Sequence, residues 1–166
     1  MVSARLFQCC FHDAKSRFFR GFNAILGKVG RLASEEVIVA LLKSKCLPIL
    51  LYATEAVPLF SRHKQSMEFT INRIFMKLFS TGSLDVVNEC LLSFNFLPVN
   101  LQICIRTARF LQRFLALDNS LCRLFEDIAK RQLFSIFCYF GDNIKTACEL
   151  RNAIYDKYFV TDTDTV

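Results

Sequence analysis

The chain has 166 residues, about one domain, and its 53% hydrophobic content is high for a soluble domain. With only 5 Gly and 3 Pro it has little turn-forming material, which excludes a fold of many short strands and favours long helices. The net charge of +6 belongs to the first half, because residues 1–77 carry 12 Lys and Arg against 5 Asp and Glu, whereas residues 78–166 carry 9 against 10. An acidic partner, either nucleic acid or an anionic surface, is therefore expected for the first half.

The first predicted helix runs from about Ala14 to Val29. At helical spacing its apolar residues gather on one arc, which predicts the core side: Phe18, Phe19, Phe22, Ile25, Leu26 and Val29. Basic residues gather on the opposite arc and at the glycine-rich exit: Arg17, Arg20, Lys28 and Arg31. These four residues form either an ordinary solvated face or a surface for a polyanion.

The second predicted helix starts at Ser34, a favourable N-cap, with Glu35 and Glu36 in the first turn, where carboxylates suit the helix dipole. Pro48 removes a backbone donor and predicts a kink or a break. The stretch PILLYATEA is expected to continue as helix. The segments before and after Pro48 are apolar on almost every side of the helix, which predicts that both are buried in the middle of the fold.

Three helices are predicted in the centre of the chain, over about 61–79, about 85–92 with Asp85 as its cap, and about 98–117 opening at Pro98. The last of these carries a basic stripe whose residues lie one turn apart: Arg106, Arg109 and Arg113. Because the second half is not net positive, acidic residues of neighbouring helices are the expected partners of this stripe.

The last two predicted helices span about Asn119 to Phe140 and Asp142 to Phe159. In the Gly141-Asp142 pair between them, Gly141 is expected to end the first helix and Asp142 to be the N-cap of the second. The segment FSIFCYF fits a strand as well as a helix. Residues 161–166 are expected to be a frayed tail. Together these elements predict an all-α protein, an irregular bundle of about six to seven helices.

The motifs of common enzymes are missing. Gly27 and Gly30 do not form a phosphate-binding loop, and the two histidines, His12 and His63, do not complete a triad. Neither an enzyme nor a cofactor nor a metal site is predicted. Eight Cys without a CxxC pair predict free thiols in a reducing compartment, the nucleus or cytoplasm.

Targeting and membrane segments are not expected either. Charged residues interrupt the start of the chain, so it does not read as a signal peptide. The longest uncharged run, 90–105, is too short and too polar to span a bilayer.

A family resemblance appears in the stretch FFRGFNAILGKVGRLASEEVIVALLKSKCLPILLYATEAVPL, followed by NRIFMKLF. It resembles the region directly after the polymerase palm in reverse transcriptases of non-LTR (LINE-type) retrotransposons. The shared pattern is an Asn-Ala-Ile helix, a Gly-x-x-Gly exit, a Ser-Glu-Glu helix start and a Lys-x-Lys-Cys-x-Pro-x-x-Leu-Tyr helix. The dense match covers about 16–79. The stretch NECLLSFNFLPVNLQICIRTARFLQRFL is similar to the more variable post-thumb segment, and residues from about 118 carry no resemblance.

The resemblance implies a thumb-like helical subdomain at 1–80, a post-thumb segment at 81–160 packed on it, and a tail at 161–166. In that family the thumb grips the template–primer duplex. The resemblance therefore favours contacts with the phosphates of an RNA–DNA or DNA duplex for the basic residues of the first helix: Arg17, Arg20, Lys28 and Arg31.

The sequence departs from the family in one decisive respect. The Tyr/Phe-x-Asp-Asp turn whose carboxylates hold two catalytic metal ions is absent, so the chain is not expected to polymerise by itself. The expectation is a C-terminal fragment of such a polymerase, or a mis-split reading frame, whose missing palm and fingers would cover surplus apolar surface. Two alternatives stay open: an all-helical protein-interaction module, and a decayed element product without function.

Overall fold

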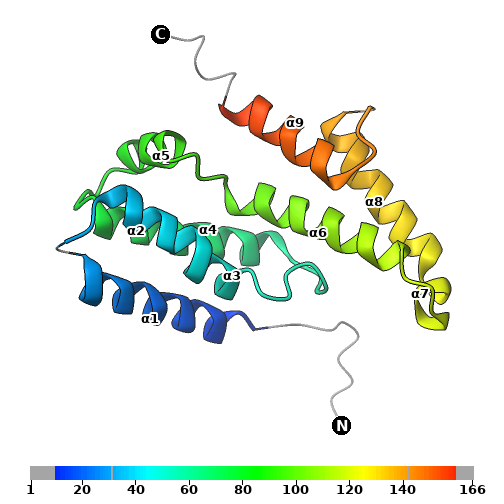
Figure 1. Cartoon of the computed structure of the whole chain (residues 1–166), viewed down its shortest axis with the longest axis horizontal. Helices are drawn as coiled ribbons and strands as arrows, with labels where there is room; N and C mark the ends of the chain where they lie inside the picture. Colours follow the sequence, from blue (N-terminus) through cyan, green and yellow to red (C-terminus); the bar gives the residue numbers. More distant parts are fainter. Residues whose placement is uncertain (1–9, 31, 142, 160–166) are drawn as a thin grey trace. The chain divides into compact units, whose positions relative to one another are not determined.

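The computed structural model describes residues 10–30, 32–141 and 143–159. Of these, 76% are helical and none lie in strands, which confirms the predicted all-α class. When the contiguous segments α2, η1 and α3 are taken as one, the described residues form eight helices, slightly more than expected (Figure 1). The chain divides into two compact units, residues 1–96 and 97–166.

The helices of the first unit follow the predicted order closely. They are α1 (His12–Val29), α2 (Glu35–Leu41), the π-helix η1 (Leu42–Cys46), α3 (Leu47–Leu50), α4 (Ser61–Leu78) and α5 (Leu84–Ser93). Helix α1 packs along the α2–η1–α3 segment. A Cβ at Gly21 would lie 3.5 Å from Cys46 Sγ, which is ordinary van der Waals contact, so there is room for a methyl group here. A side chain much larger than a methyl group would therefore push the two segments apart.

Pro48 does not break the helix. The chain passes into η1 directly before it, where the backbone N–H of Leu47 donates to the carbonyl of Leu42, five residues back. Pro48 then lies in the first turn of α3, where a missing N–H costs little. The wider helical turn thus accommodates the proline, which makes the predicted break wrong and leaves the helix continuous from Glu35 to Leu50.

Two expectations for this region are wrong. Helix α3 ends at Leu50, and residues 51–57 form turns rather than further helix, because Ala53 adopts a left-handed conformation with φ of 60°. Burial is also incomplete, since Val37 and Tyr52 are exposed. The residues of the segment that do reach the core are spaced for one helical face: Ile38, Val39, Leu42, Cys46, Leu47 and Leu50.

The core of the first unit is aromatic. The Phe75 and Phe96 rings meet edge to face with centroids 5.3 Å apart, the arrangement that the quadrupoles of two aromatic rings favour. Helix α4 has the predicted bounds within one residue, and its inward face is the predicted one. The largest fully buried side chains of this unit are Phe18, Phe22, Leu42, Leu50, Leu51, Met67, Ile71, Ile74, Phe75 and Phe96. At α5 the N-cap is Ser83, and Asp85 lies inside the first turn instead.

The second unit contains α6 (Val99–Leu115), α7 (Ser120–Leu124), α8 (Glu126–Phe140) and α9 (Ala147–Phe159). Helix α6 opens directly after Pro98, as predicted. Its inner face contributes to a core that α8 and α9 complete. The buried members of that core are Leu97, Ile105, Ala108, Phe137, Ala147, Leu150 and Ile154.

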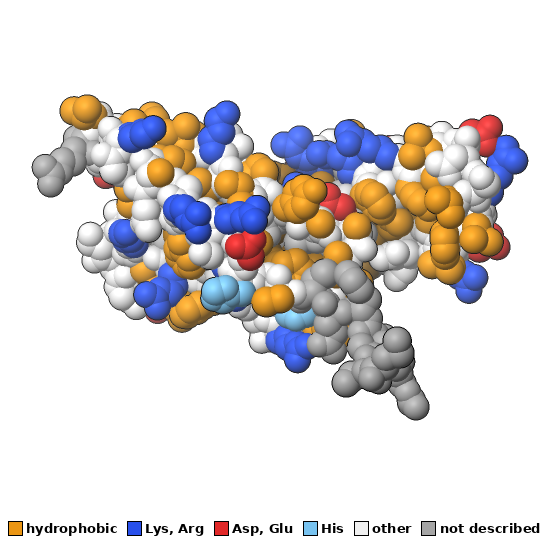
Figure 2. Space-filling view, turned by 90° about the horizontal axis from the view of Figure 1, so that it is seen from below, with side chains coloured by type: hydrophobic (Ala, Val, Ile, Leu, Met, Phe, Trp, Pro, Cys, Tyr) orange, Lys and Arg blue, Asp and Glu red, His pale blue; other side chains and the backbone are white. Residues whose placement is uncertain are grey.

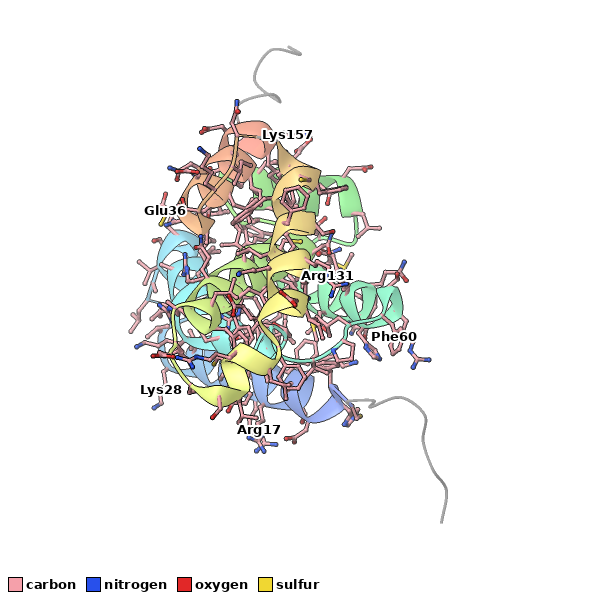
Figure 3. All side chains as sticks on the ribbon, turned by 90° about the vertical axis from the view of Figure 1, so that its right-hand side faces the viewer. Arg17, Lys28, Glu36, Phe60, Arg131 and Lys157 are labelled. Carbon is pink, nitrogen blue, oxygen red and sulfur yellow. The ribbon has the colours of Figure 1, made fainter. Side chains whose placement is uncertain are left out.

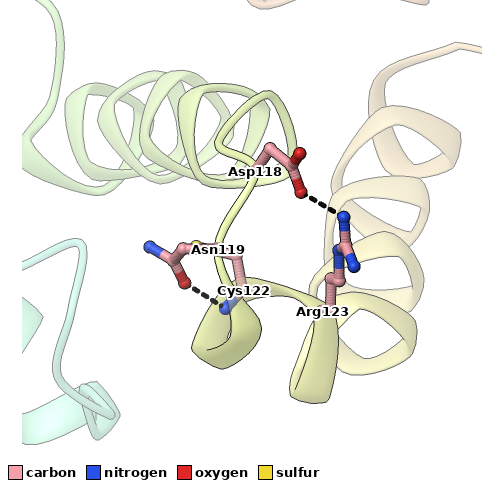
Figure 4. Close-up of polar contacts among 4 residues, drawn as sticks. All are labelled: Asp118, Asn119, Cys122 and Arg123. Atoms are coloured by element: carbon pink, nitrogen blue, oxygen red, sulfur yellow. Dashed lines mark hydrogen bonds and ion pairs between the residues drawn. The ribbon is translucent and has the colours of Figure 1, made fainter.

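The single helix predicted for residues 119–140 is two helices that meet at Phe125. Asn119 is the N-cap of α7, and its Oδ1 accepts from the Cys122 backbone N–H at 2.8 Å (Figure 4). Beside this cap the Arg123 guanidinium pairs with the Asp118 carboxylate. The ambiguous FSIFCYF segment is helical within α8.

Gly141 ends α8, as predicted, with φ of 153°, a conformation that glycine adopts readily. The next helix does not follow at once, since α9 begins only at Ala147. Asp142, its expected cap, lies outside the described residues, as do Arg31 and the tail 161–166. The start of α9 is instead a capping box. The backbone N–H of Glu149 donates to Thr146 Oγ1 at 3.1 Å, and Glu149 Oε2 accepts from the backbone N–H of Lys145 at 2.8 Å and of Thr146 at 3.2 Å.

Candidate nucleic-acid interface

Helix α1 has the two-sided character that the sequence predicts. Phe18 and Phe22 are completely buried and anchor the helix to its unit. Arg17, Arg20 and Lys28 are exposed on the other side. Figure 3 shows the Arg17 and Lys28 side chains pointing outward from the helix. Three of the four predicted basic residues therefore share one solvent-facing stripe, which we call the α1 stripe (Arg17, Arg20 and Lys28); Arg31 is outside the described residues.

Arg17 has a carboxylate partner, but the pair is at the surface. Its Nη2 lies 2.8 Å from Asp13 Oδ2 one helical turn earlier, and the two side chains are 66% and 71% exposed. An ion pair with this exposure contributes roughly 0–1 kcal/mol and is screened by salt. A phosphate group can therefore take the place of Asp13 without a large penalty, and Arg17 is not held inside the fold.

The basic stripe of α6 is placed differently. Arg109 and Arg113 are exposed and Arg106 is half-buried. The three residues lie in the second unit, whose helices also carry exposed acidic residues such as Asp127 and Asp156. Charge of both signs on one unit is typical of a solvated surface. The α1 stripe is accordingly the stronger candidate of the two.

A second basic surface lies between α1 and α4, and the sequence analysis missed it. The two helices run in the same direction, and Lys15 Nζ donates to Ser66 Oγ at 2.8 Å near their start, while Lys77 Nζ donates to Asn23 Oδ1 at 2.8 Å near their end. Between these bridges are two hollows of about 700 and about 500 Å³ that share Phe19 and Arg73. We call this surface the α1–α4 groove; its other lining residues are His12, Ser16, Phe22, Phe69, Thr70, Ile74 and Met76.

The sequence does contain one signal for this groove. Lys15 falls within the apolar arc of α1, three residues before Phe18 and four before Phe19, so it faces the body of the unit rather than solvent. A cation on the inward side of an amphipathic helix needs a polar partner on another element. That the partner is Ser66 of α4 depends on tertiary packing.

Lys43 shows that some positive charge of the first unit is structural. Its ammonium donates to the backbone carbonyls of Phe94 and Asn95, at the end of α5, and lies 5.8 Å from the Phe96 ring centroid. Burial lowers the pKa of this amine. Because two of its three donors are used on these carbonyls, Lys43 holds the α5 terminus in place, and we do not assign it to the candidate interface.

One face of the molecule mixes charge with apolar groups. On the face shown in Figure 2, Lys and Arg side chains stand among hydrophobic ones, and acidic side chains are few. Exposed large hydrophobic residues of the first unit include Leu32, Val37, Tyr52, Phe60 and Phe69. A surface of this kind suits a partner that offers both negative charge and flat apolar groups.

The described segments contain no candidate metal site and no candidate membrane span. Across the described segments, no three His, Cys, Asp or Glu side chains gather closely enough to hold a metal ion. The cysteines in these segments carry free thiols, and burial raises the pKa of the Cys46 thiol. No helix within residues 10–30, 32–141 and 143–159 has the length and apolarity needed to cross a membrane.

Comparisons with known proteins do not narrow the class further. No protein-family model matches the chain, and neither the curated proteins nor the solved structures contain a match to it. The fold defines the class as an all-α protein.

Proposed function

We propose that this chain is a thumb-like helical fragment of a retrotransposon-type RNA-directed DNA polymerase, which binds template–primer duplex through the α1 stripe and is not catalytic alone. One observation carries the proposal. Arg17, Arg20 and Lys28 are exposed on a single helix whose Phe18 and Phe22 are buried. Such a helix presents cations to a phosphate backbone from a rigid support, and Arg can bond two phosphate oxygens at once.

Two further features support the polymerase origin. The stretch from Ser16 to Phe79 that resembles the family forms one helical unit together with α5, rather than being split between units. Exposed hydrophobic side chains such as Leu32 and Tyr52 are what a thumb separated from its palm and fingers would leave uncovered.

The test is duplex binding by a charge-reversed stripe. We expect the variant Arg17→Glu/Arg20→Glu/Lys28→Glu to lose its affinity for an RNA–DNA duplex at low salt. For the unsubstituted chain, log Kd should change with log salt concentration by about 0.9 for each phosphate contacted. Fluorescence anisotropy with a labelled duplex, recorded over a salt series, measures both quantities.

A matched control separates a local contact from net charge. The variant Arg109→Glu/Arg113→Glu/Arg131→Glu changes the charge by the same amount at exposed positions of the second unit. Its duplex affinity should stay close to that of the original chain. Equal losses in both variants would show that overall charge, not the α1 stripe, drives binding, and unchanged binding in the stripe variant would overturn the assignment.

A second candidate function, a protein-interaction module, has its own observation. Large hydrophobic residues are exposed at helical spacing across α7 and the start of α8: Leu121, Leu124, Phe125 and Ile128. Contiguous exposed apolar surface is typical of protein–protein interaction sites. If the original chain shows no duplex affinity even at low salt, this second function becomes the better explanation.

A further inference from the structure

The α1–α4 groove has a consistent charge that the duplex proposal does not use. Among the described residues that line its two hollows there is no Asp or Glu. The lining does contain four basic residues: His12, Lys15, Arg73 and Lys77. The carboxylate of α4, Glu68, is not part of the lining. The groove therefore complements a negatively charged occupant.

The hydrogen bonds that span the groove orient its cations without neutralising them. Lys15 and Lys77 donate to the hydroxyl of Ser66 and to the amide oxygen of Asn23, both of which are neutral. Each ammonium keeps two further donors. Arg73 lies beside a ring, with its guanidinium carbon 5.8 Å from the Phe69 centroid.

An exposed ring stands beside these cations. Phe69 is 59% exposed although it lies in the middle of α4, and it lines the larger hollow. Phe19, half-buried, contributes a second ring to both hollows. Aromatic faces next to a row of cations are the arrangement by which proteins stack the bases of a single strand while they contact its phosphates.

The length of the groove is suitable as well. Lys15 and Asn23, which mark its two bridges on α1, are eight residues apart. At 1.5 Å per residue this is about 12 Å. A stacked strand advances about 3.4 Å per nucleotide, so about three nucleotides fit between the bridges.

We propose that the α1–α4 groove binds single-stranded nucleic acid, with Phe69 stacking on a base and Arg73 and Lys77 contacting phosphates. An extended acidic peptide would satisfy the cations but not the exposed ring, which is why a nucleic acid is the better occupant. This inference rests on the proposed function in one respect: both take the partner to be a nucleic acid. Its residues are separate from the α1 stripe, which lies on the other side of α1.

The experiment compares groove and stripe variants on two probes, a labelled mixed-sequence DNA strand of about 12 nucleotides and a blunt duplex. We expect Phe69→Leu, which keeps an apolar side chain but removes the ring, to weaken single-strand binding by at least about fivefold. Phe69→Tyr, which keeps the ring, should bind normally. For Arg73→Gln/Lys77→Gln, the slope of log Kd against log salt concentration should fall by about 1.4 for single-strand binding, or about 0.7 for each cation removed.

Controls match each substitution elsewhere in the chain. Phe134→Leu replaces a similarly exposed ring on α8, at 69% exposure, and Arg109→Gln/Lys45→Gln replaces an exposed arginine of α6 and an exposed lysine of η1. Both should leave single-strand binding unchanged. Helical circular dichroism of every variant confirms that the fold is retained, and because Phe69 and Arg73 are exposed, loss of the fold is not expected.

The outcomes separate this inference from the duplex proposal. Loss of single-strand binding in the groove variants with duplex binding intact supports the groove, whether or not the stripe variant affects the duplex. Single-strand binding that survives Phe69→Leu and Arg73→Gln/Lys77→Gln overturns it. Tighter binding of a polyglutamate peptide than of the DNA strand also overturns it, in favour of an acidic protein partner.

Discussion

At the scale of single side chains, the basic residues of the first unit stand in two different environments. The Arg17 ion pair with Asp13 is open to solvent, so its energy is small and phosphate can replace the carboxylate. Lys43 donates instead to two backbone carbonyls that end α5, where removal of the ammonium would leave those acceptors without a partner. Exposure and the identity of the acceptor, rather than the residue type, decide which basic residues are available to a ligand.

Ala53 is a point of backbone strain that a single substitution should relieve. Its φ of 60° costs an L-residue about 1–2 kcal/mol, whereas glycine adopts this conformation freely. We expect Ala53→Gly to raise the free energy of unfolding by about 1 kcal/mol, as measured by urea denaturation.

The neighbouring alanine provides the control for this prediction. Ala56 belongs to the same run of turns but is not among the residues with positive φ, so Ala56→Gly should lower the free energy of unfolding slightly. A destabilising effect of Ala53→Gly equal to that of Ala56→Gly would show that the left-handed conformation is not strained.

At the scale of the elements, the ends of the helices are held in different ways. Helix α7 has a single side-chain cap from Asn119, whereas the start of α9 has the reciprocal pair Thr146 and Glu149. The reciprocal arrangement satisfies backbone donors on both sides of the helix start. Helix α9 completes the core of the second unit through Leu150 and Ile154, so its first turn matters to the whole unit.

Removal of the α9 cap should destabilise the protein measurably. We expect Thr146→Ala to lower the free energy of unfolding by about 1 kcal/mol, since the Glu149 backbone N–H loses its acceptor. Ser135→Ala, at an exposed position in the middle of α8, should change it by less than about 0.5 kcal/mol. Urea denaturation monitored by circular dichroism compares the two. Equal effects would show that Thr146 does not act as a cap.

The same cap has a pH dependence with a defined sign. Hydrogen bonds from the backbone of Lys145 and Thr146 lower the pKa of Glu149 below its ordinary value of 4.5. The stabilisation by the carboxylate is therefore complete above that ordinary value and is lost as the pH falls through the lowered one. We expect Glu149→Gln to be less stable than the original chain at neutral pH, with the difference vanishing at a pH well below 4.5. A difference that persists in acid would contradict a role for the ionised carboxylate.

At the scale of the whole molecule, each of the two compact units has its own hydrophobic core. That of the first unit is built around Phe75 and Phe96, and that of the second around Ala108, Leu150 and Ile154. The net positive charge lies mostly in the first unit, because residues 1–96 carry 12 Lys and Arg against 7 Asp and Glu, whereas residues 97–166 carry 9 against 8. We therefore expect the ligand-binding surfaces on the first unit.

Core substitutions should act mainly on the unit that contains them. We expect Phe75→Ala to cost about 3–5 kcal/mol and Leu150→Ala about 2–5 kcal/mol, because both side chains are completely buried. Hydrogen exchange should then show lost protection in the helices of residues 12–93 for the first variant and of residues 99–159 for the second. The same loss along the entire chain in both variants would show that the units unfold as one.

Helix positions and their inward faces were largely predictable from the sequence. Apolar residues at a period of 3.6, few glycines, Ser34 before a pair of glutamates, and Pro98 at a helix start are local signals, because each acts within one or two turns of the chain. They predict α1, α4 and α6 nearly to the residue, together with the outward-facing Arg17, Arg20 and Lys28. The resemblance to the retrotransposon polymerases remains a proposal.

Other features were decided only by tertiary packing. The left-handed Ala53 is a conformation that local preference opposes, and it persists because the surrounding contacts require it. The late start of α9, by contrast, has a local signal in the capping residues Thr146 and Glu149. The α1–α4 groove, like the conformation of Ala53, depends on tertiary packing. Lys15 and Ser66, or Asn23 and Lys77, are more than fifty positions apart, and only the parallel course of two helices brings them together. Periodicity determines which side of each helix is apolar, whereas the choice of neighbour across that side depends on the shapes of side chains that meet only in the folded chain.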